Sequence, residues 1–329
     1  MSAGADRPLV VVLGGSGFVG AAVVEALAQR PIRLRTVGRR PQSTPARGVA
    51  TVEARSADLT DRRELEAAVA GADAVVHLLM HTAGWRAAAG DPASERVNVG
   101  VMSDVVELLR ARRGTAGSPA VVFAGSTSQA GLAERMPLDG GEPDRPTTAY
   151  DRQKHAAEQI LKDATAAGLV RGVSLRLPTV YGDSPSGRLT GRGVVSTMVR
   201  KAFAGEELTL WNDGTVQRDL LYVHDAAAAF LAGLDHADLL AGRHWLLGTG
   251  RGVPLGDVLR TIADLVAARL GQPPVPVVCV PPPAVATSTD MHSVVIDSSR
   301  FRTATGWRPR VPLHTALRRC VDAFAQNTG

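Results

Sequence analysis

The chain is poor in cysteine, in lysine and in aromatic residues. Its 329 residues include two cysteines, Cys279 and Cys320, which do not form a CxxC motif. Two isolated thiols exclude a disulfide framework and give no support to a metal or redox site, and a reducing compartment suits them. Aromatic residues make up 4% of the chain, and no basic run is interleaved with them. We therefore expect no metal site and no nucleic-acid binding.

Long apolar segments are also absent. No stretch approaches the roughly 18 apolar residues that a membrane helix needs, and residues 1–8 lack the hydrophobic segment of a signal peptide. We expect a cytoplasmic protein without membrane contact. The net charge is +5 and comes mostly from scattered arginines, a pattern that favours phosphorylated small molecules as ligands.

The first half of the chain alternates β-branched runs with longer helical patterns, which predicts an α/β fold with a Rossmann-type doubly wound parallel sheet. The predicted strands are 9–13, 34–37, 74–78, 120–123 and 173–177. The predicted helices between them are 21–29, 61–70, 97–112 and 150–167.

After Pro178 glycine and proline become more frequent and the alternation less regular. We predict a larger Rossmann-type domain of residues 1–177 plus about 223–250, and a smaller mixed lobe of residues 178–222 and 251–329. In the lobe, helices are expected at 190–204, 255–270 and 313–325, and strands at 208–211, 275–280 and 294–296.

A glycine-rich turn, GGSGFVG at residues 14–20, follows the first predicted strand and opens the first helix. Such a turn brings backbone N–H groups and the positive end of the helix dipole to a pyrophosphate. The strand and helix on either side are the context that this motif requires. We therefore predict a dinucleotide site that includes Gly14, Gly17, Phe18, Val19 and Gly20.

The end of the second strand predicts which dinucleotide is bound. An acidic residue there would bond the ribose 2′-hydroxyl of NAD, but the sequence reads TVGRR at residues 36–40. Arg39 and Arg40 could pair with the 2′-phosphate of NADP. We therefore expect NADPH/NADP⁺ as the cofactor, with a solvated surface pair as the alternative interpretation.

Tyr150 and Lys154 stand four residues apart at the start of a predicted helix. This spacing puts both side chains on one helical face. A nearby ammonium lowers the pKa of a tyrosine and makes it usable in acid–base catalysis. Ser126, after the preceding strand, could hold a substrate carbonyl beside the tyrosine, although turn capping is the alternative for any single hydroxyl of this cluster.

With these motifs the chain resembles the extended short-chain dehydrogenases/reductases, in their nucleotide-sugar branch. The resemblance covers essentially the whole length. It rests on the glycine turn, Asp58-Leu59, Asn98, Ser126, Tyr150 with Lys154, RLPTVYG at 176–182, RDLLYVHD at 218–225, and the segment from Asp297 through GWRP at 306–309.

The resemblance implies roles for individual residues. Ser126, Tyr150 and Lys154 would be the catalytic triad, with Lys154 also holding the nicotinamide ribose. Asp58 and Leu59 would lie at the adenine, and Pro178 and Val180 at the nicotinamide. The substrate contacts implied are Trp85, Ser126, Thr127, Thr179, Arg218 and His292, with Arg218 on the diphosphate. Trp85 and His292 could instead be a core aromatic and a surface histidine.

Departures from the family pattern narrow the reaction. Thr127-Ser128 replaces the Asp-Glu pair of sugar-nucleotide 4,6-dehydratases, so we expect no dehydratase. The arginine pair favours an NADPH that is consumed and exchanged. The chain looks most like NDP-4-keto-6-deoxyhexose 4-ketoreductases, which reduce the C4 ketone of a dTDP-linked sugar in antibiotic deoxysugar pathways.

Three alternatives remain open at this stage: a nucleotide-sugar 4-epimerase, a reductase of non-nucleotide ketones, and an NADP-binding regulator without catalysis. The presence of Ser126, Tyr150 and Lys154 argues against the regulator. Helices 97–112 and 150–167 resemble the pair through which many family members dimerise, so a homodimer is expected.

Overall fold

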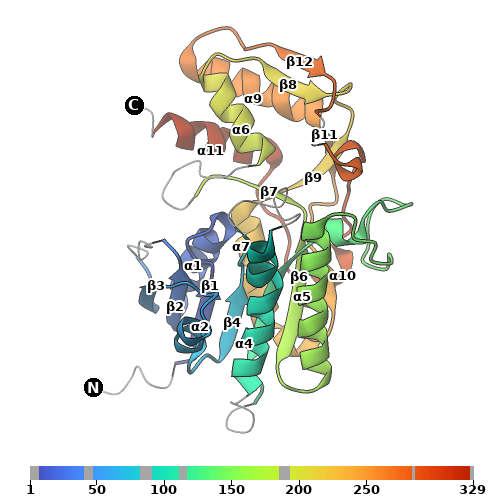
Figure 1. Cartoon of the computed structure of the whole chain (residues 1–329). Helices are drawn as coiled ribbons and strands as arrows, with labels where there is room; N and C mark the ends of the chain where they lie inside the picture. The colour runs from blue at the N-terminus through green and yellow to red at the C-terminus, as the bar shows by residue number, and fades with distance from the viewer. Residues whose placement is uncertain are drawn as a thin grey trace.

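The computed structural model describes residues 7–40, 47–81, 91–110, 117–184, 193–283 and 286–326. It has two lobes, and the larger one is built on a seven-stranded parallel sheet (Figure 1). The strand order is β10-β6-β5-β4-β1-β2-β3, which confirms the predicted doubly wound α/β fold. In sequence order the strands are β1 (Leu9–Leu13), β2 (Arg33–Gly38), β3 (Thr51–Ser56), β4 (Ala74–His77), β5 (Ala120–Ser126), β6 (Arg171–Leu177) and β10 (His244–Leu246).

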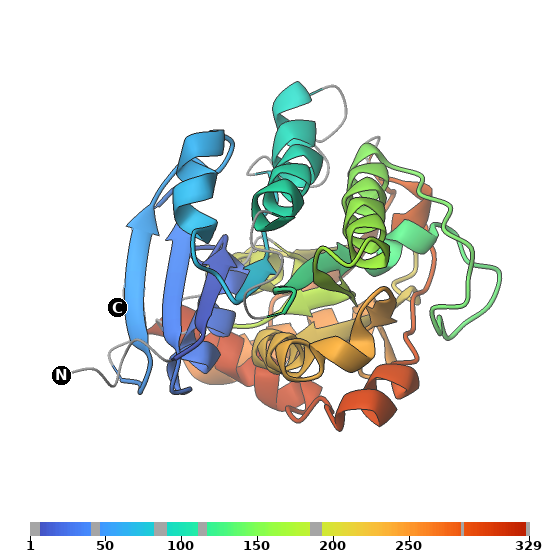
Figure 2. The same cartoon turned by 90° about the horizontal axis from the view of Figure 1, so that it is seen from below.

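Helices cover both faces of this sheet, as the view from below shows (Figure 2). α1 (Phe18–Ala28) and α7 (Val223–Asp235) pack together on one face. The opposite face carries α2 (Arg62–Val69), α4 (Val101–Arg110) and α5 (Ala149–Ala166). Since every residue of β1 is buried, its side chains alternate between two apolar clusters: Val10 and Val12 pack with α1 and α7, and Val11 with α2, α4 and α5. A continuous apolar run is the expected sequence of a strand buried on both faces.

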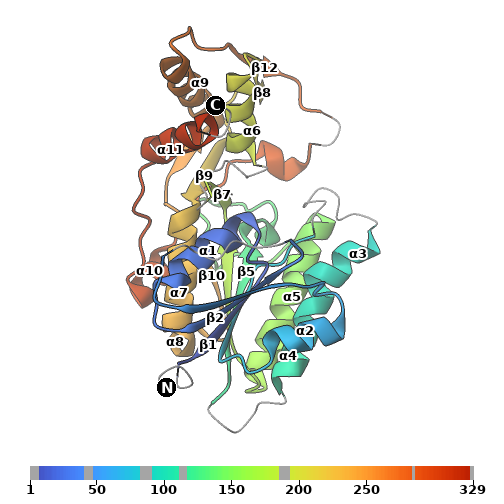
Figure 3. The ribbon, with the colours of Figure 1, turned by 90° about the vertical axis from the view of Figure 1, so that its left-hand side faces the viewer.

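The smaller lobe follows directly from the carboxyl end of β6 and lies beyond that edge of the sheet (Figure 3). It contains a three-stranded sheet, β11-β9-β7, and a two-stranded sheet, β12-β8. Its strands are β7 (Thr179–Tyr181), β8 (Leu208–Trp211), β9 (Gln217–Tyr222), β11 (Gly252–Pro254) and β12 (Val277–Val280). Its main helices are α6 (Val194–Phe203), α9 (Leu255–Leu270) and α11 (Leu313–Ala325).

Short elements complete the fold. They are α3 (Pro92–Glu95), a π-helical turn (Arg96–Gly100), two 3-10 turns (Thr127–Ala130 and Ser288–Met291), α8 (Ala237–Leu240) and α10 (Ser299–Thr305). Within the described part of the chain, no helix is both long and apolar enough to cross a bilayer.

The structure corrects several sequence expectations. Residues 294–296 form isolated bridges to Arg218 and Leu138 rather than a strand of their own. The helix expected over residues 97–112 begins as a π-helical turn. β3 was missed, because this edge strand pairs only with β2 and most of its side chains are exposed, so it lacks the apolar run of a buried strand.

Candidate active site

Backbone hydrogen bonds hold the glycine turn against the end of β2. The Gly14 and Gly15 amides donate to the Val37 carbonyl, at 2.8 and 3.3 Å, and the Gly17 amide donates to Gly14 O at 2.9 Å. Gly14 has a φ of +89°, and a Cβ atom at Gly20 would lie 2.1 Å from Gly14 O. Glycine is therefore required at both ends of the turn.

The turn leaves the start of α1 available to a ligand. Gly17 is the N-cap residue of α1 and supplies no side-chain cap, so the first N–H groups of the helix have no partner from the cap. Phe18 and Val19 form the first turn of the helix. A pyrophosphate would satisfy these donors and would find no side chain between itself and the backbone. The residues present thus fit a dinucleotide.

The adenosine end of the predicted cofactor site carries positive charge. Arg39 and Arg40 are exposed directly after β2, and the Arg40 guanidinium donates to Ser16 O at 3.3 Å. Asp58 accepts hydrogen bonds from the amide and the hydroxyl of Thr60, and these bonds, helped by the Arg39 charge, lower the pKa of its carboxyl. Leu59 is buried in the core beside α2 and α4. Since its side chain lies inside the protein, any contribution of Leu59 to the cofactor comes through its backbone.

The Lys154 side chain makes hydrogen bonds to the backbone at the carboxyl ends of β4 and β5. Its ammonium donates to Ala124 O at 2.9 Å and to Leu79 O at 3.3 Å, and it lies 4.8 Å from the centre of the Phe123 ring. The side chain is 3% exposed, and this burial lowers the pKa of Lys154 to about 7. The α5 helix therefore fixes the Lys154 ammonium at the point where the two strands end.

His77, the last residue of β4, lies next to this lysine and was not singled out in the sequence. It is fully buried and contacts the Phe123 ring edge-on, and neither ring nitrogen has a hydrogen-bond partner among the residues that the structure describes. Burial, and secondarily the charge of Lys154, lower the pKa of His77 to about 3. The imidazole is therefore neutral at physiological pH.

Tyr150 lies one turn before Lys154 on the same face of α5, with the ammonium 6.0 Å from the centre of its ring. Burial raises the pKa of Tyr150, the Asp151 charge raises it further, and a hydrogen bond with the Ser126 side chain lowers it. Ser126 is the last residue of β5. The structure thus brings together the three residues predicted to be catalytic.

Two further side chains, Ser128 and Asp151, extend this group. The hydroxyl oxygens of Ser126 and Ser128 are 2.7 Å apart, and Ser128 Oγ donates a short hydrogen bond to Asp151 Oδ1. The sequence analysis considered Ser128 as a member of the hydroxyl cluster and as the residue that replaces a dehydratase acid, and it did not select Asp151. The signal present was the carboxylate adjacent to Tyr150, but its contact with Ser128 spans 23 residues and depends on the packing of α5.

Asn98 connects α5 to the chain segment that follows β4. It is buried in the π-helical turn, where its side-chain oxygen accepts from the His81 amide at 3.0 Å and its side-chain nitrogen donates to Gln153 at 2.8 Å. Single π-helical turns inside helices are frequent at functional sites. Here the turn connects the chain after β4 to the helix that carries Tyr150.

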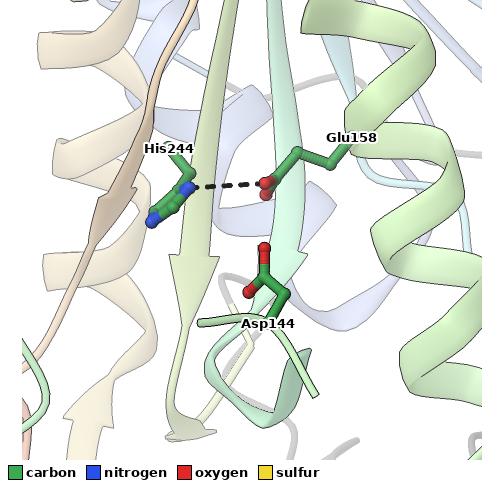
Figure 4. A group of neighbouring side chains, drawn as sticks. All are labelled: Asp144, Glu158 and His244. Atoms are coloured by element: carbon green, nitrogen blue, oxygen red, sulfur yellow. Dashed lines mark ion pairs between the residues drawn. The ribbon is translucent and has the colours of Figure 1, made fainter. Parts of the chain in front are cut away.

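A buried ionic cluster includes Glu158, which follows Lys154 by one turn on α5. Figure 4 shows Glu158 with its neighbours Asp144 and His244. Arg176 donates to Glu158 at 2.7 and 3.0 Å and to Asp144 at 2.6 and 2.8 Å. Lys162 donates to Glu158 at 2.7 Å, and the His244 ring nitrogen lies 3.5 Å from the same carboxylate. Burial alone would raise the pKa of Glu158, but hydrogen bonds from His244 and Arg176 lower it overall.

Asp144, Glu158 and His244 are close enough together to hold a metal ion in geometric terms. Both carboxylates are already paired with the Arg176 guanidinium, however, so an incoming cation would have to displace that charge. The cluster instead supports the active site, because Gln129 donates to Glu158 at 3.2 Å while its oxygen accepts from the Ser126 amide at 2.8 Å. Gln129 thereby connects the cluster to the catalytic serine.

The residues predicted to contact the substrate lie in several parts of the structure. Thr127 is buried, and its hydroxyl donates to Leu177 O at 3.3 Å. Pro178, Thr179 and Val180 form the partly buried passage from β6 into β7, at the junction of the two lobes. Trp85 lies outside the described residues.

Arg218 and His292 meet in the smaller lobe. The terminal nitrogens of Arg218 donate to the backbone carbonyls of Gln217, Thr289, Asp290 and His292, and two of these bonds measure 2.6 Å. His292 is exposed, with Nδ1 2.8 Å from Ser288 O. A diphosphate contact at Arg218, as the family resemblance implies, would require some of these carbonyl bonds to be exchanged.

Comparison with known proteins agrees with this arrangement. The model of the NAD dependent epimerase/dehydratase family matches residues 10–248. A UDP-glucose 4-epimerase of Azospirillum brasilense is 29% identical, with 93% of this chain and 88% of the relative covered. A dTDP-L-rhamnose 4-epimerase of Burkholderia thailandensis is 26% identical, with 98% and 96% covered.

Solved structures give the same fold. A UDP-glucose 4-epimerase of Thermotoga maritima, solved with UDP-glucose, has a TM-score of 0.81 at 21% identity, with 98% of this chain and 100% of the other covered. The resemblance to extended short-chain dehydrogenases/reductases is thereby confirmed. With the glycine turn against α1, the Ser126, Tyr150 and Lys154 group at the ends of β4 and β5, and a family match over most of its length, the chain belongs to the NAD dependent epimerase/dehydratase family.

Proposed function

We propose that the protein is a nucleotide-sugar 4-epimerase, which inverts the configuration of the C4 hydroxyl of its substrate. The observation that carries this proposal is the convergence of Ser126, Tyr150 and Lys154 beside a glycine turn that fits a dinucleotide. The full-length similarity to 4-epimerases supports it. The 4-ketoreductase expected from the sequence becomes the second candidate.

The chain's own residues suit a reversible oxidation at C4. A bound nicotinamide would supply the acceptor and donor of hydride. Tyr150 exchanges a proton with the C4 oxygen, and Ser126 holds that oxygen beside the phenol. Lys154, fixed by two backbone carbonyls, places a positive charge on the same side. In the first half-reaction the C4 oxygen loses its proton and the C4 carbon its hydride. In the second, the hydride returns to the opposite face of the C4 carbon and a proton to the C4 oxygen, so no external reductant is consumed.

A specific observation favours the second candidate, an NADPH-dependent reductase of a nucleotide-linked 4-keto sugar. The carboxyl end of β2 offers Gly38, Arg39 and Arg40 and no acidic side chain. That composition matches a 2′-phosphate better than a ribose 2′-hydroxyl. An NADP⁺ formed in such a reaction would have to exchange in every turnover, whereas an epimerase regenerates its cofactor in place.

One set of measurements separates the two candidates. The purified protein is denatured, and the released nucleotide is identified as NAD⁺ or NADP⁺. The native protein is then incubated with UDP-glucose, UDP-galactose or a dTDP-hexose without added cofactor, and the sugars are followed by ¹H NMR. Separately, NADPH oxidation at 340 nm is measured with dTDP-4-keto-6-deoxyglucose.

Interconversion without added cofactor, with released NAD⁺, would establish the epimerase. NADPH oxidation by the keto sugar, without interconversion, would replace it with the reductase. Absence of both reactions would contradict both candidates. A homodimer through α4 and α5, which pack against each other on the outer face of the sheet, remains our expectation, and light scattering would test it.

A further inference from the structure

We propose that Arg96 is a positioning residue for the adenosine half of the bound dinucleotide, because its guanidinium fixes the loop 58–60 at the carboxyl edge of the large sheet. This inference rests on the cofactor of the proposed function and not on the sugar reaction. It deepens that function by naming a residue outside the glycine turn that shapes the cofactor site.

Two loops leave the carboxyl edge of the sheet on the same face. The loop after β3 leads into α2, and the loop after β4 leads towards α4, which packs beside α2 (Figure 3). In the sheet, β1 and β2 lie between β4 and β3. A dinucleotide held by the glycine turn after β1 extends across the carboxyl end of β2. The two loops would therefore bound its adenosine half.

The loop after β4 is held on two sides. It packs against the glycine turn, where a Cβ atom at Gly14 would lie 3.2 Å from the backbone carbonyl of Leu78. Three residues further on, the His81 amide donates to the side-chain oxygen of Asn98 at 3.0 Å. Asn98 belongs to the π-helical turn Arg96–Gly100, so this turn fixes the first of the two loops.

Arg96 fixes the second loop from the same turn. Its Nε and one terminal nitrogen donate to the backbone oxygen of Thr60, at 3.2 and 2.7 Å. That terminal nitrogen also donates to Asp104 on α4 at 2.7 Å, which fixes the direction of the guanidinium. Because Arg96 stands two residues before Asn98, a single turn of helix sets the separation of the two loops.

The position of Thr60 in turn orients the Asp58 carboxylate. The amide and the hydroxyl of Thr60 both donate to Asp58 Oδ1, at 3.0 and 2.8 Å. Asp58 Oδ2 accepts no hydrogen bond from any residue that the structure describes. A carboxylate oxygen of this kind can accept from the exocyclic amine of an adenine. Arg96 therefore acts on the ligand through Thr60 and Asp58 and not by touching it.

Gly100, the last residue of the π-helical turn, makes room for this guanidinium. A Cβ atom at Gly100 would lie 2.7 Å from Arg96 Nη1 and 3.2 Å from Arg96 Cδ. Glycine is unfavourable within a helix, and here it allows the Arg96 side chain to lie back across its own turn. An added methyl group would displace the end of a flexible side chain, so it would move the guanidinium away from Thr60 at little cost to folding.

The test compares Arg96→Met with Arg62→Met by isothermal titration of protein stripped of nucleotide. Arg62 donates to the same Asp104, at 2.8 Å, but its other partner is Glu107 and not the Thr60 carbonyl. Arg96→Met should weaken NAD⁺ and ADP-ribose by about tenfold, the scale of a hydrogen bond to a charged group. Arg62→Met should leave both affinities within about twofold, although it removes an ion pair of the same carboxylate.

Three further variants distinguish positioning from a general loss of structure. Arg96→Lys, which keeps the charge and a donor, should lose less affinity than Arg96→Met. Gly100→Ala, which keeps the arginine but displaces it, should weaken NAD⁺ in the same direction. In an Asp58→Ala background, Arg96→Met should cost less than it does alone, because Asp58 is the group that Arg96 positions.

The outcomes separate this inference from the proposed reaction. Unchanged NAD⁺ affinity in Arg96→Met, an equal loss in Arg62→Met, or strict additivity with Asp58→Ala would overturn the role of Arg96. If the wild type binds NAD⁺, Arg96→Met binds it more weakly and no nucleotide sugar reacts, the role of Arg96 stands and the reaction is wrong. Failure of the wild type to bind any dinucleotide would overturn both.

Discussion

A Cβ atom at Gly20 would lie 2.1 Å from the backbone oxygen of Gly14 and 2.9 Å from Gly15 Cα. The first turn of α1 and the loop before it therefore touch backbone to backbone. The contact sets the position of the helix N-terminus that would receive the pyrophosphate.

Gly20→Ala should weaken dinucleotide binding by tenfold or more, because the added methyl group forces the loop away from the helix, a change of the kind that costs about 1–3 kcal/mol. Isothermal titration with NAD⁺ and NADP⁺ would measure the loss. Gly193→Ala, at a position where a Cβ meets no described residue within 4 Å, is the matched control. Unchanged affinity in Gly20→Ala would contradict the proposed cradle.

Tyr150→Phe should reduce turnover by about 10²-fold to 10⁴-fold, because it removes the hydroxyl that exchanges a proton with the C4 oxygen. Cofactor affinity should stay close to that of the wild type, because the ring and Lys154 remain in place. Epimerisation rates by ¹H NMR and cofactor titration would be measured on the same preparation. Near-normal turnover in this variant would rule out the mechanism.

Lys154 should make stability depend on pH. Burial lowers the pKa of Lys154 from 10.5 to about 7 in the folded protein, so between these values the unfolded chain binds the additional proton. The free energy of unfolding should therefore rise as the pH rises from 7 towards 10.5, and this contribution is lost as the pH falls back to 7. Urea titrations of wild type and Lys154→Met at pH 7 and pH 9 would show it.

The comparison between the two proteins isolates the lysine, because all other titrating groups are shared. The difference in stability between wild type and Lys154→Met should change across this interval. A constant difference would mean that Lys154 has an ordinary pKa in the folded state.

Arg176→Met should lower the free energy of unfolding by about 3–5 kcal/mol, because it takes the shared guanidinium from Asp144 and leaves the buried Glu158 with Lys162 as its ammonium partner. A double variant, Arg176→Met with Glu158→Leu, should lose less than the sum of the single changes, because the buried charge that lost its guanidinium is removed as well. Urea unfolding of the three variants gives the coupling directly. Strict additivity would show that the pair is energetically independent.

Arg39 and Arg40 should determine the choice of cofactor. Replacing both with alanine should weaken NADP⁺ by tenfold or more and leave NAD⁺ within about threefold, because the ribose 2′-phosphate alone loses its charged partners. Arg260→Ala, an exposed arginine on α9 paired with Asp257, controls for the change in net charge. Unchanged affinity for NADP⁺ would identify the arginines as a solvated surface pair, and equal losses for both dinucleotides would contradict a contact with the 2′-phosphate.

Much of the fold could be predicted from the sequence because its signals are local. The run Leu9–Leu13 followed by glycines identifies a buried strand and a phosphate-binding turn, and α9 and α11 have the predicted bounds. The short strands β7, β9 and β11 could not be found in this way. They pair with one another across long stretches of chain, and their side chains carry no repeating apolar pattern.

Local spacing in the sequence was enough to find the glycine turn, the Tyr150 and Lys154 pair and the polar cluster at the end of β5. The contact of Ser128 with Asp151, the bridge from Arg176 to Glu158 and Asp144, and the carbonyl bonds that hold Arg218 depend on how the chain packs. These contacts join residues 18 to 74 positions apart. Their geometry is set by how α5 and the smaller lobe pack against the sheet, and no local spacing encodes it.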